Sequence, residues 1–387
     1  MKKLDSKNLG FGHFVPAIKG QRAFVPDNLP PEIEWTADII KALSDANLAI
    51  GRLHGVGLNL PNPNLFIAPF IRREAELSSR IEGTQAELRD LYLFEMHEPA
   101  PGSDVRDVKE VSNYVRALEY GLNRCNELPV CIRMIKELHT ILLEGVRGDS
   151  DMPGKFRQSQ NWIGSGGSPI EQAIYIPPPP GEVMECLDAF EKFINTPAGD
   201  IPILVWLAMV HYQFEAIHPF RDGNGRIGRL LIVLLICTQK LLDKPMLYLS
   251  AYFERNRQEY YNRLLRVSTY GEWSQWVLFF LRGVIEQSGE AFEKSRQLLR
   301  LQQKYQGMIK SKRAAIQIKL VDLLIERPVV STVFVSEYFK VSYQTAKNNI
   351  ASLIKLGVLK KVEGMKRNKL YFAEEVLDII NRPFQQI

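Results

Sequence analysis

A twelve-residue stretch near the middle of the chain, HPFRDGNGRIGR at 218–229, combines groups that could bind phosphate and accept a proton. Its Gly-Asn-Gly run would let successive backbone N–H groups converge at the start of a helix, where anions bind. Arg226 and Arg229 lie three apart, so a helix would place both on one face, within reach of successive phosphates. Asp222 offers a hard oxygen ligand for magnesium, and His218 offers a base that can be neutral near pH 7. These residues predict a nucleotide clamp with a proton acceptor beside it.

Each part of this stretch has a plainer interpretation when it stands alone. A histidine before a Pro-Phe pair is usually structural, and an isolated Asp-Gly-Asn-Gly is usually only a turn. Here the base, the turn and both arginines fall within twelve residues. Their joint occurrence favours the functional interpretation.

The stretch resembles the signature of the Fic family, His-x-Phe-x-(Asp/Glu)-Gly-Asn-Gly-Arg-x-x-Arg, and meets every fixed position. The resemblance implies a protein adenylyltransferase, which moves AMP from ATP to Tyr, Thr or Ser hydroxyls of a protein, with the chain itself as a candidate substrate. By the same resemblance, His218 is the general base and Asp222 is the Mg²⁺ ligand. The expected nucleotide-binding residues are Gln213, Asp222, Gly223, Asn224, Gly225, Arg226, Gly228, Arg229, Tyr252 and Asn256.

Some of these expectations depend on helices that flank the signature. An almost wholly apolar helix over 201–216 would be central and would bring Gln213 and His218 to the turn. Tyr252 and Asn256 lie four apart on a helix expected over 250–265, a spacing that suits stacking on a base and hydrogen bonding to it. Core packing is an equal alternative for Tyr252.

A second informative stretch, SSRIEG at 78–83, lies in a helix expected over 65–94. Ser78 and Glu82 are four apart and share a face, and Gly83 allows a bend directly after the glutamate. A solvated helix face is the plainer interpretation. The stretch also resembles the Fic family's inhibitory motif, Ser/Thr-x-x-x-Glu-Gly/Asn, in the version that precedes the core. That resemblance implies that Glu82 pairs with Arg229 in the place of the γ-phosphate.

Composition places the chain among ordinary globular proteins. It has 387 residues, of which 45% are hydrophobic and 24% are charged, enough for two or three domains. Its four cysteines show no metal-ligand spacing, which suggests reduced thiols and a cytoplasmic location. We expect neither a signal peptide nor a membrane span, because no apolar run approaches the roughly 20 residues that a spanning helix needs.

The expected fold is mainly α, a Fic-fold helical core with a β-hairpin flap, followed by a small α+β winged-helix domain. We expect an N-terminal helical region with the inhibitory helix at 1–110, the catalytic core at 111–275, a helical connector at 276–312 and a winged helix-turn-helix domain at 313–387. Residues 1–35, rich in proline and glycine, predict extended coil. Further helices are expected at about 35–50, 131–143, 184–194 and 230–242.

The run AIYI at 173–176 predicts a strand or hairpin, because it is rich in β-formers and lies between GSGGS and four prolines. A plain surface loop is the alternative. In the Fic family, a hairpin flap at this position holds the target's peptide by strand pairing.

The last domain carries the net positive charge of the chain. From residue 311 on there are 13 Lys and Arg against 7 Asp and Glu. Two helices joined by a tight turn and followed by a ribbon around Glu363-Gly364 predict a winged helix-turn-helix. The second helix would bury Ala346, Ile350, Leu353 and Ile354. Its outer side and the wing would offer duplex DNA the side chains of Tyr343, Gln344, Lys347, Asn348, Ser352, Lys360, Lys361, Lys366, Arg367 and Lys369. A winged helix used for protein contacts is the alternative.

Other functions remain open at this point. The chain has no GxxxxGK[ST] loop and no kinase motif set, which argues against γ-phosphate transfer. A DNA-binding transcriptional regulator that only senses ATP is the main rival, although binding alone needs no base such as His218. A Fic variant that removes AMP or moves another phosphate group is a third candidate, and a homodimer is a candidate assembly.

Overall fold

The computed structural model describes residues 10–59, 62–97, 102–148, 152–164, 167–310, 315–362 and 369–382. These residues are mainly helical, with two small antiparallel sheets, as the sequence predicts. Helix α7 (Ile203–Ile217) is central, because its side chains are apolar nearly all round and almost all are buried. It packs against α8 (Asn224–Thr238), and the two helices are joined by the turn that contains the signature.

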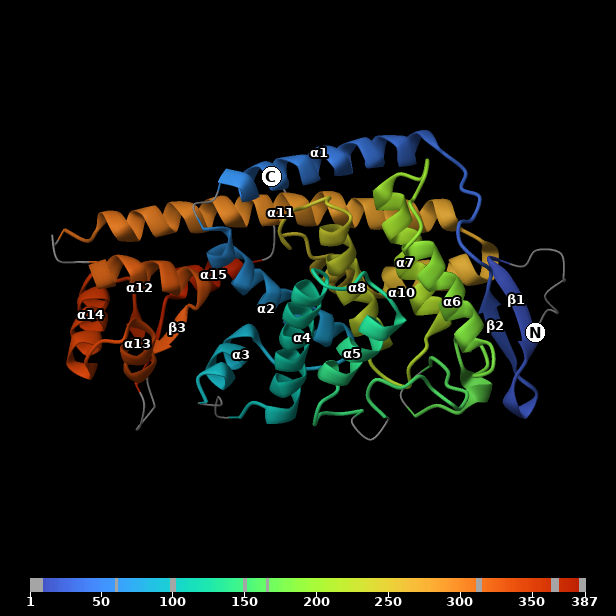
Figure 1. The fold of residues 1–387 in the computed structure, drawn as a ribbon, viewed down its shortest axis with the longest axis horizontal. Coiled ribbons are helices and arrows are strands. Elements are labelled where there is room, and N and C mark those ends of the chain that lie inside the picture. Colours follow the sequence, from blue (N-terminus) through green and yellow to red (C-terminus); the bar gives the residue numbers. More distant parts are fainter. Residues whose placement is uncertain are drawn as a thin grey trace.

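Helices on several sides cover this central pair (Figure 1). Helix α4 (Val105–Arg124) packs on α8 and on α5 (Ile132–Leu142), while α6 (Val183–Ile194) packs on α7. Helix α11 (Trp273–Gly307) runs the length of the molecule, with α1 (Ala37–Asn59) alongside it. The border expected between the catalytic core and the connector, at residue 276, falls inside α11, because this helix is continuous from Trp273 to Gly307.

The expected helix over 65–94 is wrong, because two helices stand there. Helix α2 (Pro63–Ile81) ends before Gly83, whose φ of 102° is a conformation that other residues rarely adopt, and α3 (Leu88–Glu95) begins after it. The helix expected over 250–265 is likewise divided, into α9 (Ser250–Arg255) and α10 (Arg257–Tyr270). Each break changes the direction in which the following side chains point.

The N-terminal residues form a hairpin where coil was expected. Strands β1 (Gly12–Pro16) and β2 (Arg22–Pro26) pair antiparallel with Phe14 opposite Phe24. The backbone N–H of Phe24 donates to the Ile176 carbonyl at 2.8 Å, so the hairpin borders the expected flap. Among the described residues of the flap, Ile163 and Tyr175 form an isolated bridge, and the 3₁₀ helix η3 (Ile170–Gln172) stands in place of a regular two-stranded hairpin.

The C-terminal residues form the three helices expected there, together with a strand before the second of them and a last helix, neither of which the sequence indicated. Helices α12 (Ala315–Glu326), α13 (Thr332–Phe339) and α14 (Tyr343–Lys355) and strands β3 (Val329–Ser331), β4 (Lys360–Lys361) and β5 (Leu370–Phe372) precede helix α15 (Glu374–Asn381). The strands pair in the order β3-β5-β4. The Ser342 hydroxyl caps α14 by accepting from Thr345 N at 3.1 Å.

Helix α14 turns its apolar side inward as expected, with one exception. Ala346, Ile350 and Leu353 are buried, whereas Ile354 is 37% exposed, so its predicted burial is wrong. Lys366 and Arg367 of the expected wing lie outside the described residues. Among the helices that the structure describes, none is long and apolar enough to cross a membrane.

Candidate functional site

His218 stands at the point where the chain leaves α7. It adopts a left-handed conformation with a φ of 48°, and its carbonyl accepts a 2.9 Å hydrogen bond from Arg157 Nε. Burial, aided by the positive charge of Arg157, lowers the pKa of His218 to about 4. The ring is therefore neutral at physiological pH, which a general base requires. Its Nδ1 has no hydrogen-bond partner among the described residues.

The turn after His218 is closed by side chains. The Asn224 amide donates to the Phe220 carbonyl and accepts from the Phe220 N–H, both at 2.8 Å. The His139 ring stacks on Phe220 and donates through Nε2 to the Asp222 carbonyl at 3.0 Å, since its Nδ1 accepts from Gly154 N. The side chain of Asn224 thus shapes the turn and leaves its backbone N–H in the first turn of α8.

The backbone, by contrast, has the form expected of an anion cradle. Gly223 precedes α8 with a φ of 80°, so α8 begins at Asn224 and carries both Arg226 and Arg229, as expected. The first N–H groups of α8 and its dipole lie at the turn. A Cβ on Gly225 would come within 2.4 Å of Glu82 Oε1, so this glycine leaves room for a carboxylate against the first turn.

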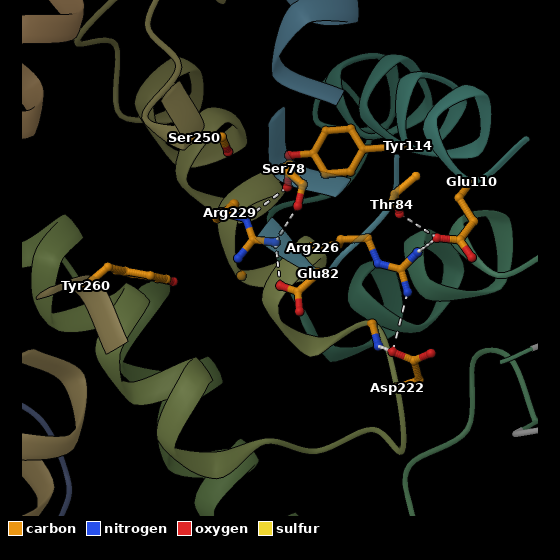
Figure 2. Close-up of polar contacts among 12 residues, drawn as sticks. Ser78, Glu82, Thr84, Glu110, Tyr114, Asp222, Arg226, Arg229, Ser250 and Tyr260 are labelled. Atoms are coloured by element: carbon orange, nitrogen blue, oxygen red, sulfur yellow. Dashed lines mark hydrogen bonds and ion pairs between the residues drawn. The ribbon is translucent and has the colours of Figure 1, made fainter. Parts of the chain in front are cut away.

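Arg229 joins α8 to the segment that contains the second motif. Its Nε donates to Ser78 Oγ, and its Nη2 donates to the Ser78 carbonyl, both at 2.9 Å. The same Nη2 donates to Glu82 Oε1 at 2.7 Å (Figure 2). The structure therefore brings together Ser78, Glu82 and Arg229, although about 150 residues of chain separate the first two from the third.

This pair is charged and mostly enclosed. Burial opposes the charge of Glu82, yet Arg229 outweighs it and holds the pKa of Glu82 below its usual value. Burial likewise opposes the charge of Arg229, but Glu82 raises the pKa of that guanidinium. Each group stabilises the other in its charged form, as expected of a charge-assisted hydrogen bond.

Arg226 has two carboxylate neighbours, one of which the sequence did not indicate. The guanidinium is fully buried, with Nη1 3.5 Å from Glu110 Oε2 and Nη2 3.4 Å from Asp222 Oδ1. Thr84, two residues after Glu82, donates to the same Glu110 oxygen at 2.9 Å (Figure 2). Glu110 therefore links the segment after the second motif to the signature arginine.

Several donors at this site have no acceptor. Among the described residues, Arg226 Nε and Arg229 Nη1 are buried and have no hydrogen-bond partner. Buried donors normally have one, and an unpaired guanidinium nitrogen carries an especially high cost. An anionic ligand with several oxygens fits these atoms.

Three expected nucleotide contacts have other partners. Gln213 donates to the Asp27 carbonyl at 2.9 Å and so holds the N-terminal segment. Tyr252 is buried against Phe279 and Gly283, and Asn256 donates to the carbonyl of Tyr252.

Two aromatic residues that interact with the charged pair come from α10. Tyr260 and Tyr261 both interact electrostatically with Arg229 and Glu82, and Tyr261 is 39% exposed. Glu215 on α7 also faces this pair, and burial raises its pKa to about 7. Its Oε1 would lie 2.3 Å from a Cβ on Gly228, so that glycine accommodates a carboxylate. The sequence analysis did not predict Glu215 as part of the site. Its position one helical turn before His218 is the sequence signal that could have indicated it.

The described residues contain no group of three or more His, Cys, Asp or Glu side chains that could hold a metal ion. Asp222 is the carboxylate at the turn, and its side chain is 35% exposed. Magnesium commonly takes one or two carboxylates, with substrate phosphates and waters as its other ligands. A single aspartate beside a phosphate site fits that pattern.

Comparison with known proteins agrees with this geometry. Residues 40–123 match the Fic/DOC family N-terminal model, and residues 129–236 match the Fic/DOC family model. The chain therefore carries Fic/DOC family domains. The Fic match covers α7, the turn and most of α8, while the N-terminal match covers the segment with Ser78 and Glu82.

The curated relatives are distant in sequence, and the chain spans less than half of their length. A protein adenylyltransferase Fic from Drosophila willistoni is 28% identical over 211 residues, which is 52% of this chain and 40% of that protein. A Fic family protein from Desulfovibrio desulfuricans superposes with a TM-score of 0.58 at 19% identity, over 89% of this chain and 98% of the other. A Fic domain protein from Bacteroides thetaiotaomicron gives 0.51 at 19% identity, over 67% and 97%. These structures establish the Fic fold.

Proposed function

We propose that the chain is a protein adenylyltransferase that transfers AMP from ATP to a Tyr, Thr or Ser hydroxyl and is held back by Glu82. The observation that carries the proposal is a neutral, half-buried His218 at the end of α7, across the turn from the N-terminus of α8, with two buried arginines on α8. The adenylyltransferase name of the Drosophila relatives adds support.

In the proposed reaction, the triphosphate lies on the first turn of α8. His218 takes the proton of the acceptor hydroxyl, the hydroxyl oxygen forms a bond to the α-phosphorus, and the bond to pyrophosphate breaks. Magnesium at Asp222 would neutralise phosphate charge. The unpaired nitrogens of Arg226 and Arg229 would donate to phosphate oxygens, so the chain contributes mainly positioning and charge stabilisation.

Intact-mass spectrometry tests this activity directly. The Glu82→Gly variant, incubated with ATP and Mg²⁺, should gain the mass of AMP on itself or on an added protein, and peptide mapping should place it on a hydroxyl side chain. Glu82→Gly, His218→Ala is the matched control and should gain none. Transfer of another phosphate-containing group, or loss of AMP from a modified protein, would point to a different Fic reaction.

We further propose that the C-terminal domain binds duplex DNA. The exposed side of α14 favours DNA binding, because it presents polar and cationic side chains that can contact bases and phosphates. These exposed side chains are Tyr343, Gln344, Lys347 and Asn348. The affinity of the full chain should fall steeply as salt rises, and Lys347→Ala should reduce the slope of log affinity against log salt by about 1. Arg296→Ala on α11 serves as the control cation. A full chain that shifts no duplex even at low salt would instead indicate a protein-interaction module.

A further inference from the structure

The C-terminal domain, here residues 315–382, packs directly on the helix that leads into the inhibitory segment. Both α12 and α15 contact α2, and Figure 1 shows them beside its first half. The second half of α2 contains Ser78 and ends at Ile81, next to Glu82. One continuous helix therefore connects the C-terminal domain to the residues that contact Arg229.

Polar contacts reinforce this packing on α2. Arg72 is 4% exposed, and its Nε donates to Glu95 Oε1 at 2.9 Å. Arg327, directly after α12, brings Nη1 to 3.8 Å from the other oxygen of Glu95. Glu95 on α3 thus bridges a cation of α2 and a cation of the C-terminal domain.

The domain also contacts the chain on the far side of the motif. The Arg89 guanidinium of α3 lies 4.6 Å from the centre of the Phe372 ring on β5, a cation–π arrangement. Arg72 precedes Ser78, and Arg89 follows Glu82. The inhibitory segment is therefore bracketed by contacts with the same domain, because α12 and α15 pack on α2 before it and Arg89 meets Phe372 after it.

The domain is itself fixed to α11. The buried Lys294 ammonium donates to the Ile380 carbonyl at 2.7 Å, and Gln302 donates to Asp322 Oδ1 at 2.6 Å. Because α11 also packs on α7, the domain has a defined position relative to the catalytic turn. The C-terminal domain thus contacts the first part of α2, while Arg229 contacts Ser78 and Glu82 at the other end of that helix.

We propose that docking of the C-terminal domain on α2 and α3 stabilises the inhibitory position of Glu82, so that moving the domain away frees Arg229. This inference rests on the proposed function. Contacts made in one arrangement of two elements favour that arrangement, and such coupling is reciprocal. Weaker docking should release Glu82, and release of Glu82 should loosen the docking.

The first test weakens the docking contacts in the full chain. Arg89→Ala, Arg327→Ala should transfer AMP about fivefold faster than wild type, the lower end of typical coupling effects. Lys355→Ala, which removes an exposed cation of α14 in the same domain, is the matched control and should leave the rate unchanged. In a Glu82→Gly background the double substitution should give no further gain. A double variant as slow as wild type, beside an active Glu82→Gly, would overturn the coupling but not the activity.

The second test needs no activity. Amide hydrogen exchange in α3 and α12 should become faster in Glu82→Gly than in wild type, because the loss of the pair loosens the docking. The tip of the β1–β2 hairpin is the internal control and should exchange equally in both proteins. Unchanged exchange in α3 and α12 would overturn the coupling, whether or not any variant transfers AMP. A lack of transfer in every variant, by contrast, would count against the proposed function alone.

Discussion

AMP transfer by His218→Ala should fall by about 10²- to 10⁴-fold, the usual contribution of a positioned base. ATP binding should be nearly unchanged, because the ring acts on the incoming hydroxyl whereas the phosphates contact the α8 N-terminus and its arginines. Radiolabelled ATP provides both measurements, with filter binding for affinity and gel autoradiography for transfer. Both proteins should also carry Glu82→Gly, because the faster transfer expected of that variant makes the loss measurable.

His54→Ala is a suitable control for this substitution. His54 is a partly exposed histidine that pairs with Asp243, remote in sequence from the signature. Its replacement should leave transfer intact. If His218→Ala transferred AMP as fast as its parent, the assignment of His218 as base would be wrong, even if the chain proved to be an adenylyltransferase.

Glu82→Gly should transfer AMP on the order of 10²-fold faster than wild type. In the structure Glu82 uses the guanidinium of Arg229 and occupies the space over Gly225. A nucleotide that enters beside it would have misplaced phosphates, and misplacement of this kind can cost about 10²-fold in rate. A charge-assisted pair is worth about 1.5–3 kcal/mol, so the fold should survive its loss.

Two further variants identify the cause of such a gain. Glu82→Gly, Arg229→Ala should lose it, because no guanidinium then remains for the phosphate. Ser78→Ala removes one acceptor from Arg229 Nε and leaves Glu82 in place, so its gain should be smaller. Initial rates at saturating ATP measure all three. A Glu82→Gly protein no faster than wild type would make the Ser78–Gly83 segment purely structural.

Local chemistry was enough to predict the centre of the site. The positive φ of Gly223, the N-terminus of α8 and the common face of Arg226 and Arg229 depend on residues within a few positions of one another. Periodicity also predicted most helices, because an apolar stripe needs no knowledge of its partner. The pairing of Glu82 with Arg229 was expected from resemblance to a motif, since nothing local connects them.

Tertiary structure decided the remaining contacts. Glu110 and Arg157 reach the signature from segments more than 60 residues upstream, and Tyr252 packs against Phe279 and Gly283 of α11. The docking of α12 on α2 is likewise absent from any local pattern. A sequence pattern states which face of a helix is apolar, whereas the identity of the facing helix depends on how all the faces pack into one core. For that reason the chemistry of this site was visible in twelve residues, and its positioning and control were not.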